Sequence, residues 1–177
     1  MSFLNVYPLL IQDEGKKLEQ VAGDSGGLTF CGIDIASNPD WAGWPQVKAD
    51  AAAGIDPTAN TQSMALVRAF YESKWAEWNL DYIPEILQPH IYGTAINEGA
   101  SSAFKMLQAA VLRQGVQVTV DGQVGPATLS AIGKCNAEWL LDSFCWIRAQ
   151  AYLTIADNHI NDQQFLRGWL NREVSGL

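Results

Sequence analysis

Apolar residues recur every three to four positions along most of this chain, and this spacing is the strongest constraint on its fold. The longest such stretch, about residues 137–158, carries on one side Leu140, Phe144, Ile147, Ala151 and Ile155. Because an α-helix makes one turn in 3.6 residues, this spacing is typical of an amphipathic helix. Shorter helices are expected over residues 5–14, 63–78, 90–100, 103–114 and 163–172. We therefore predict a mainly α fold.

Composition limits the classes of protein to which the chain can belong. The net charge of −8 argues against nucleic acid as a partner. No apolar run approaches the roughly 20 residues that cross a bilayer, so we expect no membrane insertion and see no signal peptide. Three cysteines without close spacing and two histidines argue against a disulfide framework, a structural zinc site and a histidine-rich metal centre. We expect neither a metal nor a cofactor.

One carboxylate stands out at the end of the first predicted helix. Glu14 falls at helical spacing after Tyr7, Leu10 and Ile11, on the side that the helix should bury. Partial burial disfavours the ionised form of a carboxyl group and raises its pKa, which suits a general acid near neutral pH. A single Glu at a helix end is more often solvated or salt-bridged, and this alternative stays open.

A polar, glycine-rich loop follows and brings a second carboxylate. It contains Asp24, the pair Gly26-Gly27 and the hydroxyl of Thr29. The two glycines allow positive φ and a close approach to a ligand, although Gly-Gly is usually only a turn. Leu28-Thr29-Phe30-Cys31 has strand character, so we allow a small β-hairpin here. One raised acid facing one solvated carboxylate is the arrangement that cleaves glycosidic bonds.

Aromatic and amide side chains elsewhere permit two interpretations. Trp41 and Trp44, beside Pro45, could stack on sugar rings or fill the core beneath a loop, and the sequence favours neither. Aromatic residues at the helical spacing of Trp75 are more often core than binding surface. Asn97 could hold a ligand or a water molecule, but a hydrogen-bonded structural Asn is the more common case.

Several short segments occur in a fixed order along nearly the whole chain. The N-terminal ones are Glu14-Gly15, Asp24-Ser25-Gly26-Gly27-Leu28-Thr29 and Gly32-Ile33. Those farther along are Phe70-Tyr71 to Lys74-Trp75, Asn97-Glu98-Gly99, Leu107-Gln108, Val120 to Leu129 and Gly168 to Arg172. Together, in this order, they resemble glycoside hydrolase family 108, a family of N-acetylmuramidases. The resemblance implies a lysozyme-like α bundle, with residues 1–90 as the catalytic half. Residues 91–177 would form a helical half similar to a peptidoglycan-binding module, packed with the first half as one globule.

The resemblance also implies roles for single residues. Glu14 would protonate the leaving glycosidic oxygen, and Asp24 would activate water or stabilise positive charge on the sugar, with Thr29 helping to orient it. An oxocarbenium-like transition state needs an acid on one side and a carboxylate near the ring. The implied substrate-binding residues are Gly26, Gly27, Trp75, Tyr92 and Asn97.

The implied substrate is the β-1,4 bond between N-acetylmuramic acid and N-acetylglucosamine in peptidoglycan. We expect a monomeric phage endolysin that waits in the host cytoplasm until its release to the periplasm and cell wall. A wall-remodelling factor exported with secretion machinery is the alternative setting. One alternative is a peptidoglycan-binding module that keeps the fold without catalysis. Another is an amidase or peptidase acting on the stem peptide, but such enzymes usually need zinc or a Cys/His pair.

Overall fold

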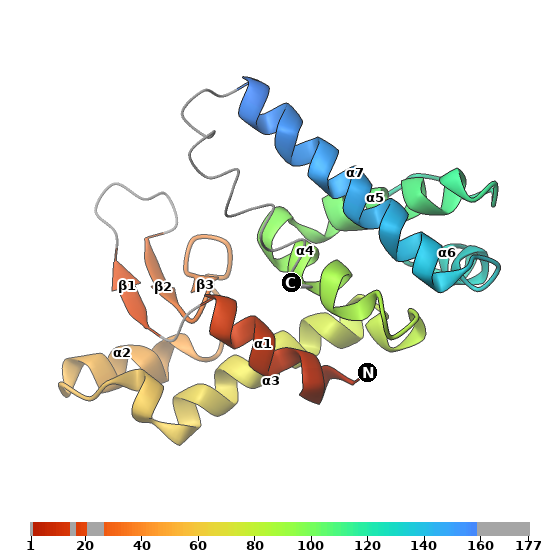
Figure 1. Ribbon diagram of the computed structural model, residues 1–177. Helices are drawn as coiled ribbons and strands as arrows, with labels where there is room; N and C mark the ends of the chain where they lie inside the picture. The colour runs from red at the N-terminus through yellow and green to blue at the C-terminus, as the bar shows by residue number, and fades with distance from the viewer. Residues whose placement is uncertain (1, 15–16, 21–26, 159–177) are drawn as a thin grey trace. The chain divides into compact units, whose positions relative to one another are not determined.

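A computed structural model describes residues 2–14, 17–20 and 27–158 of the chain (Figure 1). It confirms the mainly α fold with a small β element, and it divides into two compact units. The elements of the unit spanning residues 3–77 are α1 (Phe3–Glu14), β1 (Leu18–Gln20), β2 (Leu28–Phe30), β3 (Ile33–Asp34), α2 (Trp44–Ala52), η1 (Pro57–Ala59) and α3 (Thr61–Glu77). Those of the unit from residue 78 onward are η2 (Leu80–Tyr82), α4 (Gln88–Glu98), α5 (Ala100–Arg113), α6 (Pro126–Ile132) and α7 (Ala137–Asn158).

The expected hairpin belongs to a three-stranded antiparallel sheet in the order β1-β2-β3. Thr29 pairs with Glu19 on one side and with Asp34 on the other. Cys31 and Gly32, which connect β2 to β3, both have positive φ, at 49° and 79°. Positive φ at both central residues is the geometry of a type I′ hairpin turn, whose twist matches that of the strands.

The core of the first unit forms where α1 packs against α3. From α1 it receives Phe3, Val6, Leu10 and Ile11, and from α3 Val67, Tyr71 and Trp75. The Tyr71 hydroxyl donates a 2.7 Å hydrogen bond to the carbonyl oxygen of Cys31, which ties α3 to the hairpin turn. The apolar side predicted for the first helix is therefore confirmed as far as Ile11.

The two tryptophans left open by the sequence fill the core of this unit. Trp44 is buried, and its indole Nε1 donates to the carbonyl oxygen of Asn38 at 2.7 Å. The half-buried Trp41 meets Trp44 edge to face, with ring centroids 5.0 Å apart, and contacts Phe70 in the same way at 6.1 Å. Both rings have core partners, so the structure favours the packing alternative over sugar stacking.

Gly43 lies directly against the indole ring of Trp41, and a methyl group at this position would overlap that ring. We expect Gly43→Ala to lower the free energy of unfolding by about 1–3 kcal/mol, the usual cost of overpacking a core. Urea unfolding followed by tryptophan fluorescence measures this change. Gly133→Ala is the matched control, because φ of Gly133 is −62° and no contact there is closer than 3.6 Å. An unchanged midpoint for Gly43→Ala would contradict the packing described here.

The second unit is built around α5, which packs against both α4 and α7. Its core includes Ile91 and Tyr92 of α4, Leu107 and Val111 of α5, and Leu140 and Phe144 of α7. The apolar side predicted for residues 137–158 faces the core at Leu140 and Phe144, while Ile147 and Ala151 are half-buried and the side chain of Ile155 lies outside the described part of the structure. Figure 1 shows α7 running along α5. The helix predicted over residues 163–172 lies outside the described residues.

Candidate functional site

The predicted catalytic stretch is described only in part. The backbone of α1 ends at Glu14, as predicted, but the side chain of Glu14 lies outside the described part of the structure. Asp24 and Gly26 also lie outside the described residues. Their roles therefore stay predictions, and so does the separation of the two carboxyl groups.

In the first unit, Tyr7 connects α1 to the hairpin turn through its packing on Tyr71. Burial is the main reason that the pKa of Tyr7 rises to about 12; nearby Cys31 adds to the shift and Arg68 opposes it. Tyr7 therefore keeps its phenol proton near neutral pH. Its ring packs on Tyr71, with centroids 6.3 Å apart, and Tyr71 holds the hairpin turn through Cys31. Tyr7 of α1 and Cys31 of the β2–β3 turn thus both contact the buried side chain of Tyr71.

Gly27 and Thr29 are the two predicted loop residues that the structure describes. Gly27 has φ of +67°, which confirms the positive φ expected there, and a methyl group on it would lie 3.4 Å from Ile35 Cγ2. The backbone conformation favours glycine, whereas a contact of 3.4 Å leaves room for a methyl group. Thr29 is half-buried in the middle of β2, paired with Glu19 and Asp34. The sheet therefore fixes the backbone that carries the Thr29 hydroxyl.

The residues farther along the chain that were expected to bind sugar do not form one accessible site. Trp75 is 2% exposed and contacts Phe3 edge to face, and Tyr92 is 0% exposed beside Trp78. Because sugar stacking requires an accessible ring face, this burial corrects the assignment and gives both rings a role in the core. Asn97 is exposed, and its Nδ2 donates to the carbonyl oxygen of Gly93 at 2.9 Å. Trp75 belongs to the first unit, whereas Tyr92 and Asn97 belong to the second.

The second unit contains a buried ion pair that the sequence did not predict. Arg148, fully buried in α7, donates from Nε to Glu98 Oε1 at 2.8 Å. Tyr152 donates its hydroxyl to the same oxygen at 2.8 Å. Glu98 is the last residue of α4, so one carboxylate joins the end of α4 to α7. From the sequence, no role was assigned to Glu98 within the segment Asn97-Glu98-Gly99. No local sequence pattern links Glu98 to position 148.

A cysteine and a histidine also meet in this unit. Cys145 Sγ lies 3.8 Å from His90 Nδ1, and both residues are half-buried. Burial, and secondarily the charge of Arg148, lower the pKa of His90, so the imidazole is neutral near pH 7. This contact makes the stem-peptide alternative worth testing directly.

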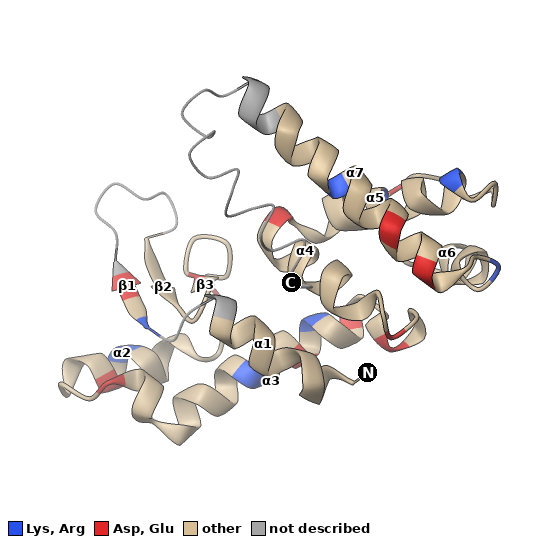
Figure 2. Ribbon diagram, in the orientation of Figure 1, with Lys and Arg blue, Asp and Glu red and all other residues tan. Residues whose placement is uncertain are grey.

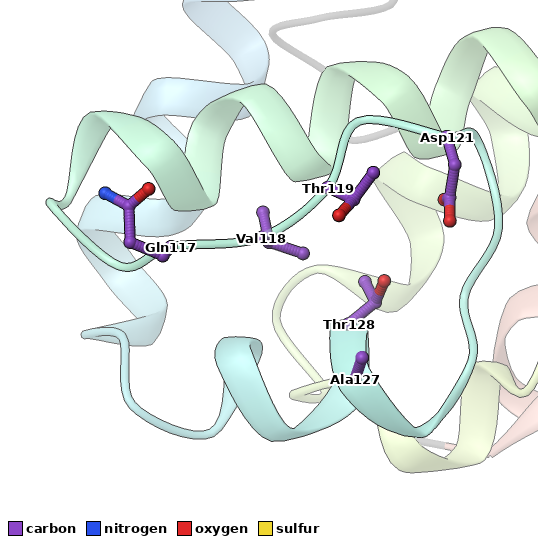
Figure 3. A pocket seen from close by; sticks show the side chains of 6 residues that line it. All are labelled: Gln117, Val118, Thr119, Asp121, Ala127 and Thr128. Carbon is purple, nitrogen blue, oxygen red and sulfur yellow. The ribbon is translucent and has the colours of Figure 1, made fainter.

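A trough lies between the extended residues after α5 and the start of α6 (Figure 3). Its volume is about 410 Å³, and its lining consists of Gln117, Val118, Thr119, Asp121, Ala127 and Thr128. The Asp121 carboxylate and the Thr128 hydroxyl point into the space between the two walls (Figure 3). A volume of this size suits a small ligand or one segment of a larger one.

Gln108, fully buried in α5, holds the trough in shape. Its Nε2 donates to Asp121 Oδ1 at 2.7 Å, to the carbonyl oxygen of Gln123 at 2.9 Å and to Thr128 Oγ1 at 3.1 Å. Its Oε1 accepts a 2.9 Å hydrogen bond from the backbone N–H of Gly122. Gln108 falls on the apolar side of α5 between Phe104 and Val111, and a polar residue at such a position is the signal that could have revealed it.

The described residues contain neither a membrane-spanning helix nor a cluster of metal ligands. No helix in the described ranges is long and apolar enough to cross a membrane. Within those same ranges, no three His, Cys, Asp or Glu side chains gather closely enough to hold a metal ion.

Comparison with known proteins assigns a family to each part of the chain. Residues 7–99 match the family described as Glycosyl hydrolase 108, and residues 102–174 match one described as Predicted Peptidoglycan domain. Among solved structures, SagA from Brucella abortus is similar over 98% of this chain and 90% of its own, with 28% identity and a TM-score of 0.71. No curated protein matches the chain.

The two matched families define a glycoside hydrolase that acts on peptidoglycan. The chain belongs to glycosyl hydrolase family 108, because that match spans residues 7–99, which is 93 of its 177 residues. The resemblance noted in the sequence is thus confirmed at the level of the family. The predicted boundary between the halves at residue 90 stays a prediction.

Proposed function

We propose that this protein is an N-acetylmuramidase that cleaves the β-1,4 bond between N-acetylmuramic acid and N-acetylglucosamine. The observation that carries the proposal is the family 108 match over residues 7–99, which includes the end of α1 at Glu14 and the strand that carries Thr29. In this proposal Glu14 is the general acid, because a single carboxyl group at the end of a largely buried helix face can supply a proton to the leaving oxygen.

Asp24 and Thr29 complete the proposed catalytic set. Asp24 would stabilise positive charge at the anomeric carbon or activate the attacking water, and the Thr29 hydroxyl would orient that water. The paired strands on either side of β2 support this role for Thr29, since they limit the movement of its backbone. Gly26 and Gly27 would let the loop backbone approach the glycan, which the positive φ of Gly27 supports.

The biological setting that we propose is phage-type lysis. The protein would act as a monomeric endolysin, held in the host cytoplasm until it reaches the periplasm and the cell wall. Its net charge of −8 gives no general attraction to an anionic wall, so recognition would depend on local geometry. Among the described residues, the trough of the second unit offers such geometry.

Mass spectrometry of fragments released from purified sacculi tests the proposed bond. We expect disaccharide-peptides with muramic acid at the reducing end, because the proposed cleavage lies between the C1 atom of N-acetylmuramic acid and the next sugar. Release of free stem peptides would instead support an amidase or peptidase, for which the Cys145–His90 contact would be the candidate. Binding to sacculi without release of either fragment would support the non-catalytic alternative.

A further inference from the structure

Along one wall of the trough in the second unit runs a stretch of backbone that is unpaired within the described part of the chain. Residues 116–120 follow the end of α5 and belong to neither a helix nor a strand. Their backbone N–H and C=O groups make no hydrogen bond with another described residue. An exposed segment with free backbone groups can pair with a second extended chain, which is how many peptide-binding domains bind their ligands.

Asp121, at the end of the same extended wall, adds a fixed negative charge to the trough (Figure 3). Asp121 is the one ionisable residue among the six that line the trough. The side chain of Gln108 and the backbone N–H of Gln123 both donate to Asp121 Oδ1, and they hold the pKa of this carboxyl below its usual value. Asp121 is therefore ionised near neutral pH and held in one orientation. Neither Lys nor Arg lines the trough, and acidic positions occur in both units (Figure 2).

The chemistry of the trough defines its ligand. A free backbone edge favours a peptide rather than a bare glycan, because a peptide supplies amide donors and acceptors in series. A fixed carboxylate without a cationic neighbour in the lining favours an ammonium group on that peptide. Val118 and Ala127 leave room for methyl groups or methylene chains. In peptidoglycan, the stem peptide has these properties when the amino group of its diamino acid is not cross-linked.

We propose that the trough lined by Gln117, Val118, Thr119, Asp121, Ala127 and Thr128 binds the uncrosslinked stem peptide of peptidoglycan. The peptide lies extended along residues 116–120, and the ammonium group of its diamino acid contacts Asp121. This inference rests on the proposed function only in taking peptidoglycan as the substrate. It assigns recognition of the peptide to the second unit, separately from the glycan chemistry of the first.

The test uses the full chain and a soluble stem tetrapeptide, N-acetyl-L-alanyl-γ-D-glutamyl-L-lysyl-D-alanine, in which the lysine carries the single ammonium group, followed by ¹H–¹⁵N NMR. We expect the peptide to shift the amide signals of residues 116–121, 127 and 128. Acetylation of its lysine should weaken binding at least about tenfold, because the ammonium–carboxylate hydrogen bond is lost. Methylation of its backbone amides should weaken binding for a separate reason, because it blocks pairing with residues 116–120.

Asp121→Asn is the matching change in the protein. Its amide oxygen can still accept from Gln108 and Gln123, so the fold should remain while affinity for the free-amine peptide falls at least about tenfold. Asp142→Asn removes the same charge from an exposed position on α7 and should leave affinity unchanged. Equal affinity of the acetylated and free-amine peptides, or shifts that avoid residues 116–121, would overturn the inference.

Failure of this inference can be distinguished from failure of the proposed function. The tetrapeptide contains no glycosidic bond, so its binding is independent of muramidase activity. Muramic acid ends released from sacculi, together with no peptide binding at the trough, would refute the inference alone. Peptide binding at the trough without glycan cleavage would refute the proposed function and leave the inference standing.

Discussion

Glu14→Gln is expected to abolish release of reducing ends from peptidoglycan, with a fall in rate of at least about 100-fold. Positioned acid–base groups typically contribute factors of 100 to 10,000, and an amide cannot supply the proton that the leaving oxygen requires. The side chains of Glu and Gln have nearly the same size, so the far-ultraviolet circular dichroism and the thermal midpoint should remain close to those of the wild type. Turbidity loss of permeabilised Gram-negative cells gives a second readout of the same activity.

A matched control for this variant is available nearby. Glu19 lies on β1 and pairs with the ammonium group of Lys17 at the protein surface. Glu19→Gln makes the same chemical change, but surface ion pairs contribute little, so we expect activity close to that of the wild type. Asp24→Asn should lose much but not all activity. Full lytic activity in Glu14→Gln would refute the assignment of the general acid.

Glu98→Ala should lower the free energy of unfolding by about 3–5 kcal/mol, the usual cost of removing one partner from a buried ion pair. The guanidinium of Arg148 is 0% exposed and the Glu98 side chain is 18% exposed, so water cannot readily replace the lost carboxylate. Tyr152 also loses the acceptor of its 2.8 Å hydrogen bond. Urea unfolding followed by circular dichroism measures the change.

Two comparisons test whether burial of the charge causes the loss of stability in Glu98→Ala. Glu77→Ala removes the same side chain from a surface pair with Lys74, where Glu77 is 60% exposed, and should cost no more than about 1 kcal/mol. The double variant Glu98→Leu with Arg148→Met should be more stable than Glu98→Leu alone, because it removes the buried charge together with its partner. A loss below about 1 kcal/mol for Glu98→Ala would contradict this interpretation.

The helices of the described region could be predicted from the sequence because helix formation depends on local spacing. The apolar pattern of residues 137–158 predicted α7 and its buried side, and that of residues 5–14 predicted α1 as far as the backbone of Glu14. The positive φ of Gly27 is one that the sequence allowed, since glycine adopts it without steric cost. The family could be identified from short segments in order, because those segments are again local.

Only the tertiary structure decided which distant residues meet. Glu98 and Arg148 are 50 positions apart, and Gln108 holds Asp121, which lies 13 positions later. The burial of Trp75 and Tyr92 likewise depends on the elements packed over them. Their residue types and positions were compatible with both sugar binding and core packing, and only the tertiary structure could distinguish the two. A sequence pattern records the preference of a residue for a helix face or a turn. The partner that satisfies a buried charge or amide is chosen by how the helices pack, and this choice leaves no periodic signal in the chain.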